Sequence, residues 1–315
     1  MYLDHFGLAE HPFRITPHTA YFFGGGQRGA VLQAILFAAE HDEGIVCVTG
    51  EVGVGKTMLC RMAIERLSAS VKTIYFANPS LSPDALQQVI AHELGVASSD
   101  AAMRLRHIED ALIERYARHE RVVLIVDEAH AMPAPSLEQL RLLSNLESDA
   151  HKLIQIVLFG QDELLDTLAA RPLRSLRERI THRFTLAPLS RAEISDYLRW
   201  RLTAAGYKGP DLFTGASLRR LAKASAGLTR RINILADKAL MAAFADNTRT
   251  ITTTHVRRAI GDAAYPRTEP RWWRLAVATA LAISIGWVAW RTLPQWGTPA
   301  PTAEVSQATL PAKAR

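Results

Sequence analysis

The segment GEVGVGKT at residues 50–57 has the residue types and the spacing of a phosphate-binding loop. A β-like run, IVCVT, precedes it, and a segment of helical pattern follows it. In such a loop, glycines let backbone N–H groups turn toward an anion, and the following helix points its positive end at the same place. We expect Lys56 to reach the β and γ phosphates of ATP, and Thr57 to ligate Mg²⁺. The expected nucleotide contacts are Gly50, Glu51, Val52, Gly53, Val54, Gly55, Lys56, Thr57 and Met58.

Two carboxylates follow the apolar run VVLIV, within the segment VDEAH. A carboxylate at the end of a buried strand beside a phosphate loop can hold Mg²⁺ through its water shell, and this role falls to Asp127. The next residue, Glu128, would polarise the attacking water. The alternative is that both acids only cap the helix that follows. The letters DEAH also occur in a helicase motif, but we find no helicase-type arginine motif downstream.

A third candidate lies at the end of the run IQIVLF, where Gln161 follows Gly160. A polar residue at the end of this strand could contact the γ-phosphate or the attacking water, so Gln161 is a candidate sensor. The alternative is that Gln161 only begins the helix that follows. Downstream, the run RPLRSLRERITHRF is rich in arginine, and most of these arginines are expected on a solvated face.

The elements that must position these residues alternate between short apolar runs and longer segments of helical period. The expected strands are 45–49, 72–77, 122–126, 154–159 and 182–186, and the helices between them are 56–69, 83–95, 103–119, 135–147 and 162–170. This pattern predicts an α/β fold of the P-loop NTPase kind, with a parallel five-stranded sheet, over residues 1–187. Beyond Pro188, the segments 190–205, 215–225, 229–246 and 253–263 predict an all-helical lid over 188–263.

Together these segments resemble a known family. GEVGVGKT, VDEAH, the arginine-rich run and GLTRRIN resemble the corresponding parts of AAA+ ATPases, over nearly all of residues 1–263. More narrowly, MYLDHFGLAEHPFRITPHTAYFFGG, GEVGVGKTMLCR and LFGQDELL resemble the ExeA / general secretion pathway protein A group, especially the ATPase of MSHA-type pilus biogenesis.

The resemblance implies roles for several arginines. Arg179 stands where clamp-loader-like members carry the arginine finger, with Arg183 as the alternative. Arg230, in GLTRR, matches the second sensor, which approaches the γ-phosphate from the lid, whereas Arg231 is expected to be structural. An arginine finger acts on the ATP of a neighbouring subunit, so the resemblance implies a homo-oligomer, expected to be a ring.

Two further points concern the pocket itself. Tyr21 and Phe22 fall near the family's adenine pocket, although core packing is an equal alternative for them. Gln161 departs from the Asn, Ser or Thr that is common at the sensor position, which weakens its assigned role but leaves the phosphate loop untouched.

The chain beyond residue 263 predicts a membrane anchor. YPRTEP marks a linker over 264–271, residues 272–290 form an almost uncharged run flanked by Trp and Arg, and 291–315 has the composition of a disordered tail. The alternatives are an interfacial helix and a further buried helix. Arginines before the run favour a single-pass inner-membrane protein with its ATPase domain in the cytoplasm and a short periplasmic tail.

Charge and cysteine content narrow the function classes. Of the net charge of +6, +4 lies from residue 267 onward, so the rest of the chain is close to neutral and a nucleic-acid partner is unlikely. Two cysteines provide no disulfide framework. We therefore expect a membrane-anchored ATPase that assembles a secretion or pilus machine with envelope partner proteins. The alternatives are a DNA-associated ATPase similar to transposition target-selection regulators, and an exopolysaccharide-export or sorting ATPase.

Overall fold

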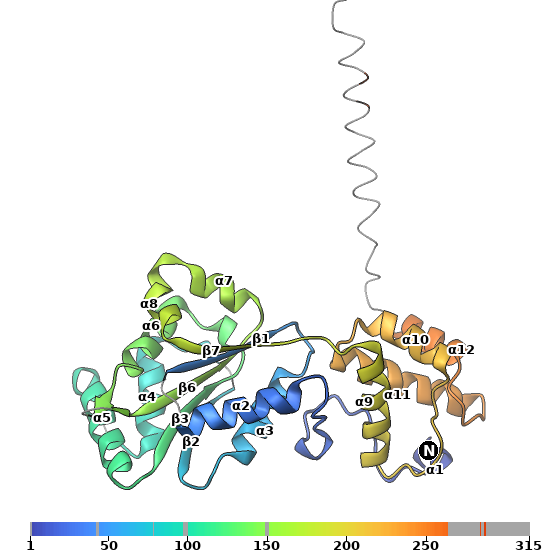
Figure 1. Cartoon of the computed structure of the whole chain (residues 1–315), viewed down its shortest axis with the longest axis horizontal. Coiled ribbons are helices and arrows are strands. Elements are labelled where there is room, and N and C mark those ends of the chain that lie inside the picture. Colours follow the sequence, from blue (N-terminus) through green and yellow to red (C-terminus); the bar gives the residue numbers. More distant parts are fainter. Residues whose placement is uncertain are drawn as a thin grey trace, which may run out of the picture. The chain divides into compact units, whose positions relative to one another are not determined.

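A parallel five-stranded sheet forms the framework of the first part of the chain (Figure 1). The computed structural model describes residues 2–41, 44–77, 79–96, 100–148 and 151–263, with Ser284 and Trp287. The strands are β1 (Ile45–Gly50), β2 (Val71–Phe76), β3 (Arg121–Val126), β6 (Ile154–Phe159) and β7 (Ile180–Leu186). They lie in the order β2-β3-β6-β1-β7 and every neighbouring pair is parallel, which confirms the predicted sheet.

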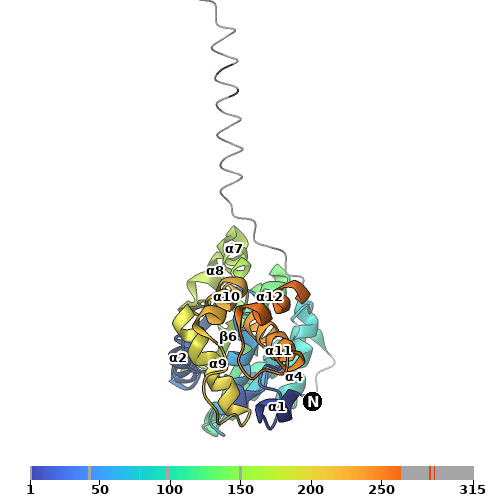
Figure 2. The same cartoon turned by 90° about the vertical axis from the view of Figure 1, so that its right-hand side faces the viewer.

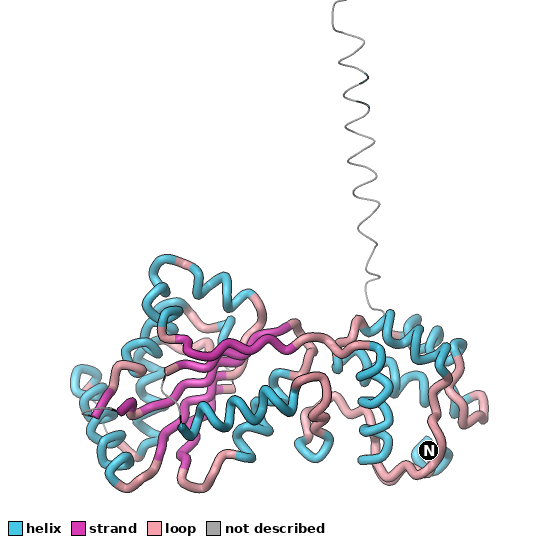
Figure 3. Tube along the Cα trace, in the orientation of Figure 1, coloured by secondary structure: helices cyan, strands magenta, loops and turns pink. Residues whose placement is uncertain are grey.

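Helices cover both faces of this sheet (Figure 3). Alternate residues of β1 point to opposite faces. Val46 and Val48 pack with α2 (Arg28–His41) and α3 (Lys56–Arg66). Ile45 and Cys47 share the other core with α4 (Pro83–Leu94), α5 (Ala101–Ala117), α6 (Ala134–Leu143), α7 (Glu163–Ala169) and α8 (Arg174–Glu178). The central strands are therefore buried on both sides, which explains their continuous apolar sequences.

The sequence pattern did not predict all the elements of this part. It omitted α2, although its buried positions Arg28, Val31, Leu32 and Ile35 recur at helical spacing. Short elements were also omitted: α1 (Tyr2–Phe6), η1 (Thr19–Tyr21), η2 (Ala129–Ala131), η3 (Arg171–Leu173), α8, and the antiparallel pair β4 (Glu147–Ser148) and β5 (His151–Lys152). Elements of this length leave little periodicity to detect.

Between residue 187 and residue 263, the structure describes four helices: α9 (Arg191–Ala204), α10 (Gly215–Ser225), α11 (Thr229–Ala245) and α12 (Thr253–Asp262). Ser190 begins α9 with a capping box that it forms with Glu193, as the sequence start signal indicated. The chain's first residues pack on these helices and not on the sheet: the Tyr2 hydroxyl donates to Asp237 of α11 at 2.6 Å. Figure 2 shows α1 beside α11.

The predicted membrane-spanning helix at 272–290 requires a correction. Except for Ser284 and Trp287, this segment lies outside the described residues, as do the predicted linker at 264–271 and the tail at 291–315. In the described parts of the chain, no helix has the length and apolar composition to cross a membrane. The longest described helices, α5 and α11, have 17 residues each, which is about 26 Å, and both carry charged side chains. The described residues therefore contain no helix of the kind that the predicted transmembrane fold class and the single-pass inner-membrane location require.

Candidate nucleotide site

The glycine-rich loop runs from the end of β1 into α3, as the sequence indicated. Gly53 and Gly55 adopt left-handed backbone angles, with φ of 82° and 110°, which residues with a side chain rarely adopt. A Cβ at Gly53 would also lie 3.1 Å from the Cβ of Arg230. Glycine at 53 therefore serves both the turn and the close approach of another segment.

Lys56 begins α3 and is buried beneath the loop. Its ammonium group donates to the carbonyl oxygens of Gly50, at 2.7 Å, and Glu51, at 3.1 Å. Burial lowers the pKa of Lys56, while the nearby carboxylates of Glu128 and Asp127 oppose that shift. A buried cation with neutral carbonyl partners is well suited to attract a polyanion.

Asp127 follows β3 and is almost fully buried. Burial raises the pKa of its carboxyl group, while hydrogen bonds from the Thr57 hydroxyl and the Glu128 backbone N–H oppose the rise. The N–H of Glu128 lies 2.9 Å from Asp127 Oδ1. The two predicted magnesium ligands thus touch each other at the foot of α3. Carboxylate and hydroxyl oxygens are the donors that Mg²⁺ prefers, so this pair fits the ion.

Glu128 projects into the same cavity from a strained backbone. Its φ of 53° and ψ of 34° place it in the left-handed region, which is uncommon for a residue with a side chain. Such strain clusters at functional sites, because the surroundings must hold it in place. Gln161, just after β6, lines the cavity too, and its side chain contacts His130. The sequence analysis did not single out His130.

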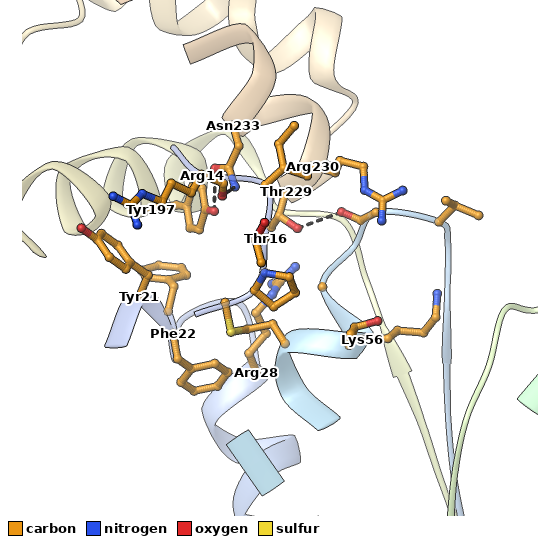
Figure 4. Close-up of a pocket in the computed structure, with 18 of the residues that line it drawn as sticks. Arg14, Thr16, Tyr21, Phe22, Arg28, Lys56, Tyr197, Thr229, Arg230 and Asn233 are labelled. Atoms are coloured by element: carbon orange, nitrogen blue, oxygen red, sulfur yellow. Dashed lines mark hydrogen bonds between the residues drawn. The ribbon is translucent and has the colours of Figure 1, made fainter. Parts of the chain in front are cut away.

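The amino end of α11 touches the loop directly. The Thr229 hydroxyl donates to the carbonyl oxygen of Gly53 at 2.8 Å, and the backbone N–H of Arg230 donates to the same oxygen at 3.0 Å. Figure 4 shows the Thr229 bond and Arg230 extending alongside the loop. The Arg230 side chain is exposed and lines the cavity. These contacts connect the phosphate loop to the helical part.

The cavity has a volume of about 320 Å³. Of the predicted nucleotide contacts, six line it, Val52, Gly53, Gly55, Lys56, Thr57 and Met58, whereas Gly50, Glu51 and Val54 do not. Gly50 ends β1, the carbonyl of Glu51 accepts a hydrogen bond from Lys56, and Val54 is packed in the core under the loop. The loop therefore presents residues 52–58, except Val54, to the cavity.

The opposite wall of the cavity comes from the amino-terminal segment and the helical part. Tyr21 and Phe22 both line it, and the guanidinium of Arg201 lies 4.6 Å from the centre of the Tyr21 ring. Arg201 also donates to the carbonyl of Pro12 at 2.5 Å. Tyr21 is buried, so it serves the packing of this wall as well as the cavity.

Arg28, on α2, is a cavity residue that the sequence analysis missed. It is buried, and its guanidinium donates to the carbonyl oxygens of Val54 at 3.0 Å and Ala187 at 3.4 Å. Burial lowers its pKa. Arg28 thus joins the phosphate loop to the residue that precedes Pro188. The apolar period of α2 was the available signal, since it predicts which face of that helix is buried.

Arg179 lies elsewhere. It is the C-cap residue that follows α8, and its carbonyl oxygen accepts a hydrogen bond from the N–H of Ile45, the first residue of β1, at 3.1 Å. Six residues of extended strand separate this position from the loop, about 17 Å. Arg183 is exposed on β7 and donates to the carbonyl of Arg177. Neither arginine lines the cavity of its own chain.

Comparisons with known proteins agree with this geometry. Residues 39–168 match the family model of the AAA domain. The chain is also a relative of General secretion pathway protein A of Aeromonas hydrophila, with 38% identity over 297 residues. The match covers 92% of this chain and 54% of that protein, so the chain spans about half the length of this relative.

Solved structures share the fold at low identity. Cdc6p from Pyrobaculum aerophilum has a TM-score of 0.58 with 17% identity, covering 90% of this chain and 79% of its own. The Aeropyrum pernix ORC1 protein in complex with DNA has a TM-score of 0.57 with 19% identity, covering 81% and 69%. The Thermotoga maritima RuvB Holliday junction branch migration motor has a TM-score of 0.53 with 16% identity, covering 79% of this chain and 73% of its own. These likenesses concern the fold alone.

Proposed function

We propose that this chain binds ATP with Mg²⁺ in the cavity beside the glycine-rich loop and hydrolyses it. The observation that carries the proposal is convergence: Lys56, Glu128 and Gln161 reach one cavity from three different strand ends, with Arg230 added from α11. Lys56 attracts the phosphates, and Thr57 with Asp127 holds the ion. Mg²⁺, when bound, neutralises charge that develops on the phosphate oxygens.

Within this site Glu128 accepts a proton from, or polarises, the water that attacks the γ-phosphorus. Gln161 and Arg230 contact the oxygens of the γ-phosphate. We further propose that residues 1–187 act as the nucleotide-binding domain and 188–263 as its lid, with the Thr229 bond to Gly53 linking lid movement to the loop. This division follows the change from sheet to helices after Pro188.

Arg179 completes the site from a second copy of the chain. Its position at the amino end of β1 keeps it away from its own cavity, which supports a finger that acts in trans. AAA+ proteins bind ATP and oligomerise, so a ring of identical subunits is the arrangement that we propose. The expected signature is turnover that rises faster than protein concentration.

The biological role that we propose is ATP-driven assembly of a secretion or pilus-type envelope machine, together with its protein components. The similarity to General secretion pathway protein A over 92% of this chain supports it. Export or sorting of polysaccharide is an alternative within the same group.

A trapped form of the protein tests this role. Glu128→Gln should hold ATP without turnover and keep its partner bound, whereas Lys56→Ala should not. We expect purification of Glu128→Gln in ATP to retain components of secretion or pilus machines that are missing from the Lys56→Ala sample. Equal sets of proteins in both samples would contradict the assembly role but not the ATPase activity.

A second candidate is ATP-dependent DNA binding. Arg171, Arg174 and Arg183 are exposed in the segment from η3 to β7, and Arg174 pairs with Glu178. Filter binding over a salt series distinguishes the two roles, because phosphate contacts weaken steeply with salt. Retention at low salt that requires ATP would favour DNA, and no retention at any salt would remove this candidate.

A further inference from the structure

We propose that His130 is a positioning residue that fixes the orientation of the Gln161 side-chain amide and links it to Glu128. The inference rests on the ATPase function proposed above. The backbone N–H of Gln161 donates to His130 Nδ1 at 3.4 Å, and the Nε2 atoms of the two side chains lie 2.7 Å apart. His130 Nε2 is also 3.5 Å from Glu128 Oε2. One imidazole ring therefore contacts both residues that face the γ-phosphate.

The contacts define which ring nitrogen carries the hydrogen. A neutral imidazole has one N–H and one acceptor nitrogen. Since Nδ1 accepts from the Gln161 backbone, the hydrogen sits on Nε2, where the Glu128 carboxylate also favours it. A rotation of 180° about the last side-chain bond of Gln161 exchanges its amide oxygen and its NH₂ group. The orientation that forms a hydrogen bond directs the oxygen to the Nε2–H of His130.

This orientation decides what Gln161 offers to a nucleotide. With its oxygen held by His130, the amide turns its NH₂ group into the cavity that Gln161 lines. Oxygens of a γ-phosphate only accept hydrogen bonds, so the NH₂ group is the half of the amide that can bind them. The opposite orientation would bring a carbonyl oxygen against a phosphate oxygen, and the two would repel.

The local packing keeps the ring in place. His130 belongs to η2, which starts immediately after Glu128, and its side chain is only 20% exposed. A Cβ at Gly160 would lie 3.4 Å from the backbone nitrogen of His130 and 2.7 Å from Leu164 Cδ2. A side chain at 160 would therefore collide with Leu164 of α7, whereas its contact with η2 would be an ordinary one. Glycine at 160 thus lets α7 pack closely beside Gln161.

Two amide substitutions separate positioning from packing. His130→Asn keeps a polar atom near Nδ1 but has no group near Nε2, whereas His130→Gln retains an NH₂ group near Nε2. We expect His130→Asn to lower kcat ~10-fold, with the KM for ATP and the unfolding temperature unchanged. This loss is smaller than the ~10²- to 10³-fold loss of a group that itself contacts the transition state, because His130 acts through Gln161. His130→Gln should recover most of that loss. Equal losses in both variants would overturn the proposal.

A double-mutant cycle with Gln161→Ala tests whether His130 acts through Gln161. If it does, His130→Asn should reduce kcat less than ~2-fold once Gln161 is already alanine, because coupled residues are not additive. A full additional loss of ~10-fold would show that His130 acts independently of Gln161 and would overturn the proposal.

Nitrogen NMR of the histidine rings in the full chain tests the contact without turnover. The wild type should show His130 with its hydrogen on Nε2, and Gln161→Ala should shift the His130 signals. A wild type that shows this contact but does not hydrolyse ATP would contradict the ATPase function. If the wild type hydrolyses ATP but the His130 signals are the same in the wild type and in Gln161→Ala, the proposed role of His130 is contradicted.

Discussion

The two ends of β1 differ in what they contribute to the proposed ATP site. At its carboxyl end, Lys56 and Thr57 line one cavity, and Asp127 is buried beside it and accepts a hydrogen bond from Thr57. At its amino end, the carbonyl oxygen of Arg179 accepts a hydrogen bond from the N–H of Ile45, and Arg179 does not line that cavity. Under the proposed function, one chain holds almost every group for ATP binding, whereas the proposed finger, Arg179, lies outside its own cavity. The proposal therefore takes that charge from a second copy.

The largest expected effect comes from Lys56→Ala at the carboxyl end. It removes the buried ammonium group that attracts the phosphates, so ATP binding and turnover should both fall by ~10³-fold or more. Titration with a fluorescent ATP analogue measures binding. Lys72→Ala is the control, because Lys72 pairs with Glu93 on the surface and should leave binding unchanged. Normal affinity in Lys56→Ala would remove the loop as the nucleotide site.

Arg179→Ala addresses the other end of β1. Turnover should fall ~10³-fold, the lower end for an arginine finger, while the affinity for ATP stays unchanged because Arg179 lies outside its own cavity. Steady-state kinetics combined with the same titration measure both quantities. Arg183→Ala is the matched variant on β7, and a full loss there with none in Arg179→Ala would transfer the finger role to Arg183.

Glu128→Gln is expected to separate binding from chemistry. The carboxylate that polarises the water is lost, so turnover should fall ~10²-fold while ATP remains bound. Single-turnover measurements with radiolabelled ATP follow the chemical step. Glu93→Gln, on the surface, serves as the control, and unchanged turnover in Glu128→Gln would exclude Glu128 as the residue that activates water.

The smallest effect is expected at the contact between α11 and the loop. Thr229→Val keeps the shape of the side chain but loses the hydrogen bond to Gly53, so the KM for ATP should rise by about 3- to 5-fold, the equivalent of one ordinary hydrogen bond. Thr229→Ser retains the hydroxyl and should behave as wild type. A KM in Thr229→Val equal to that of Thr229→Ser would show that this contact does not affect nucleotide binding.

The sequence predicted what local pattern determines. Lys56, Thr57 and Asp127 follow from the glycine spacing and from acids placed after an apolar strand. Lys56 and Thr57 line the cavity and Asp127 contacts Thr57, while their roles stay predictions. The five strands were also predictable, since burial on both faces selects continuous apolar runs.

Contacts between distant segments could not be predicted in this way. His130 and Gln161 are 31 residues apart, and Tyr2 is 235 residues from Asp237, so no local pattern pairs them. The membrane prediction, which no described helix supports, rested on the hydropathy of one segment. The longest described helices, α5 and α11, carry charged side chains and pack against other elements of the fold.

Mixing two inactive variants tests the central claim most directly. Arg179→Ala retains an intact nucleotide cavity, and Lys56→Ala retains an intact finger, so neither should turn over ATP alone. When the two are combined under conditions where mixed oligomers form, the finger of one should serve the cavity of the other, and turnover should recover to a substantial fraction of the wild-type rate. No recovery in verified mixed oligomers would contradict the assignment of Arg179 as a finger that acts between chains.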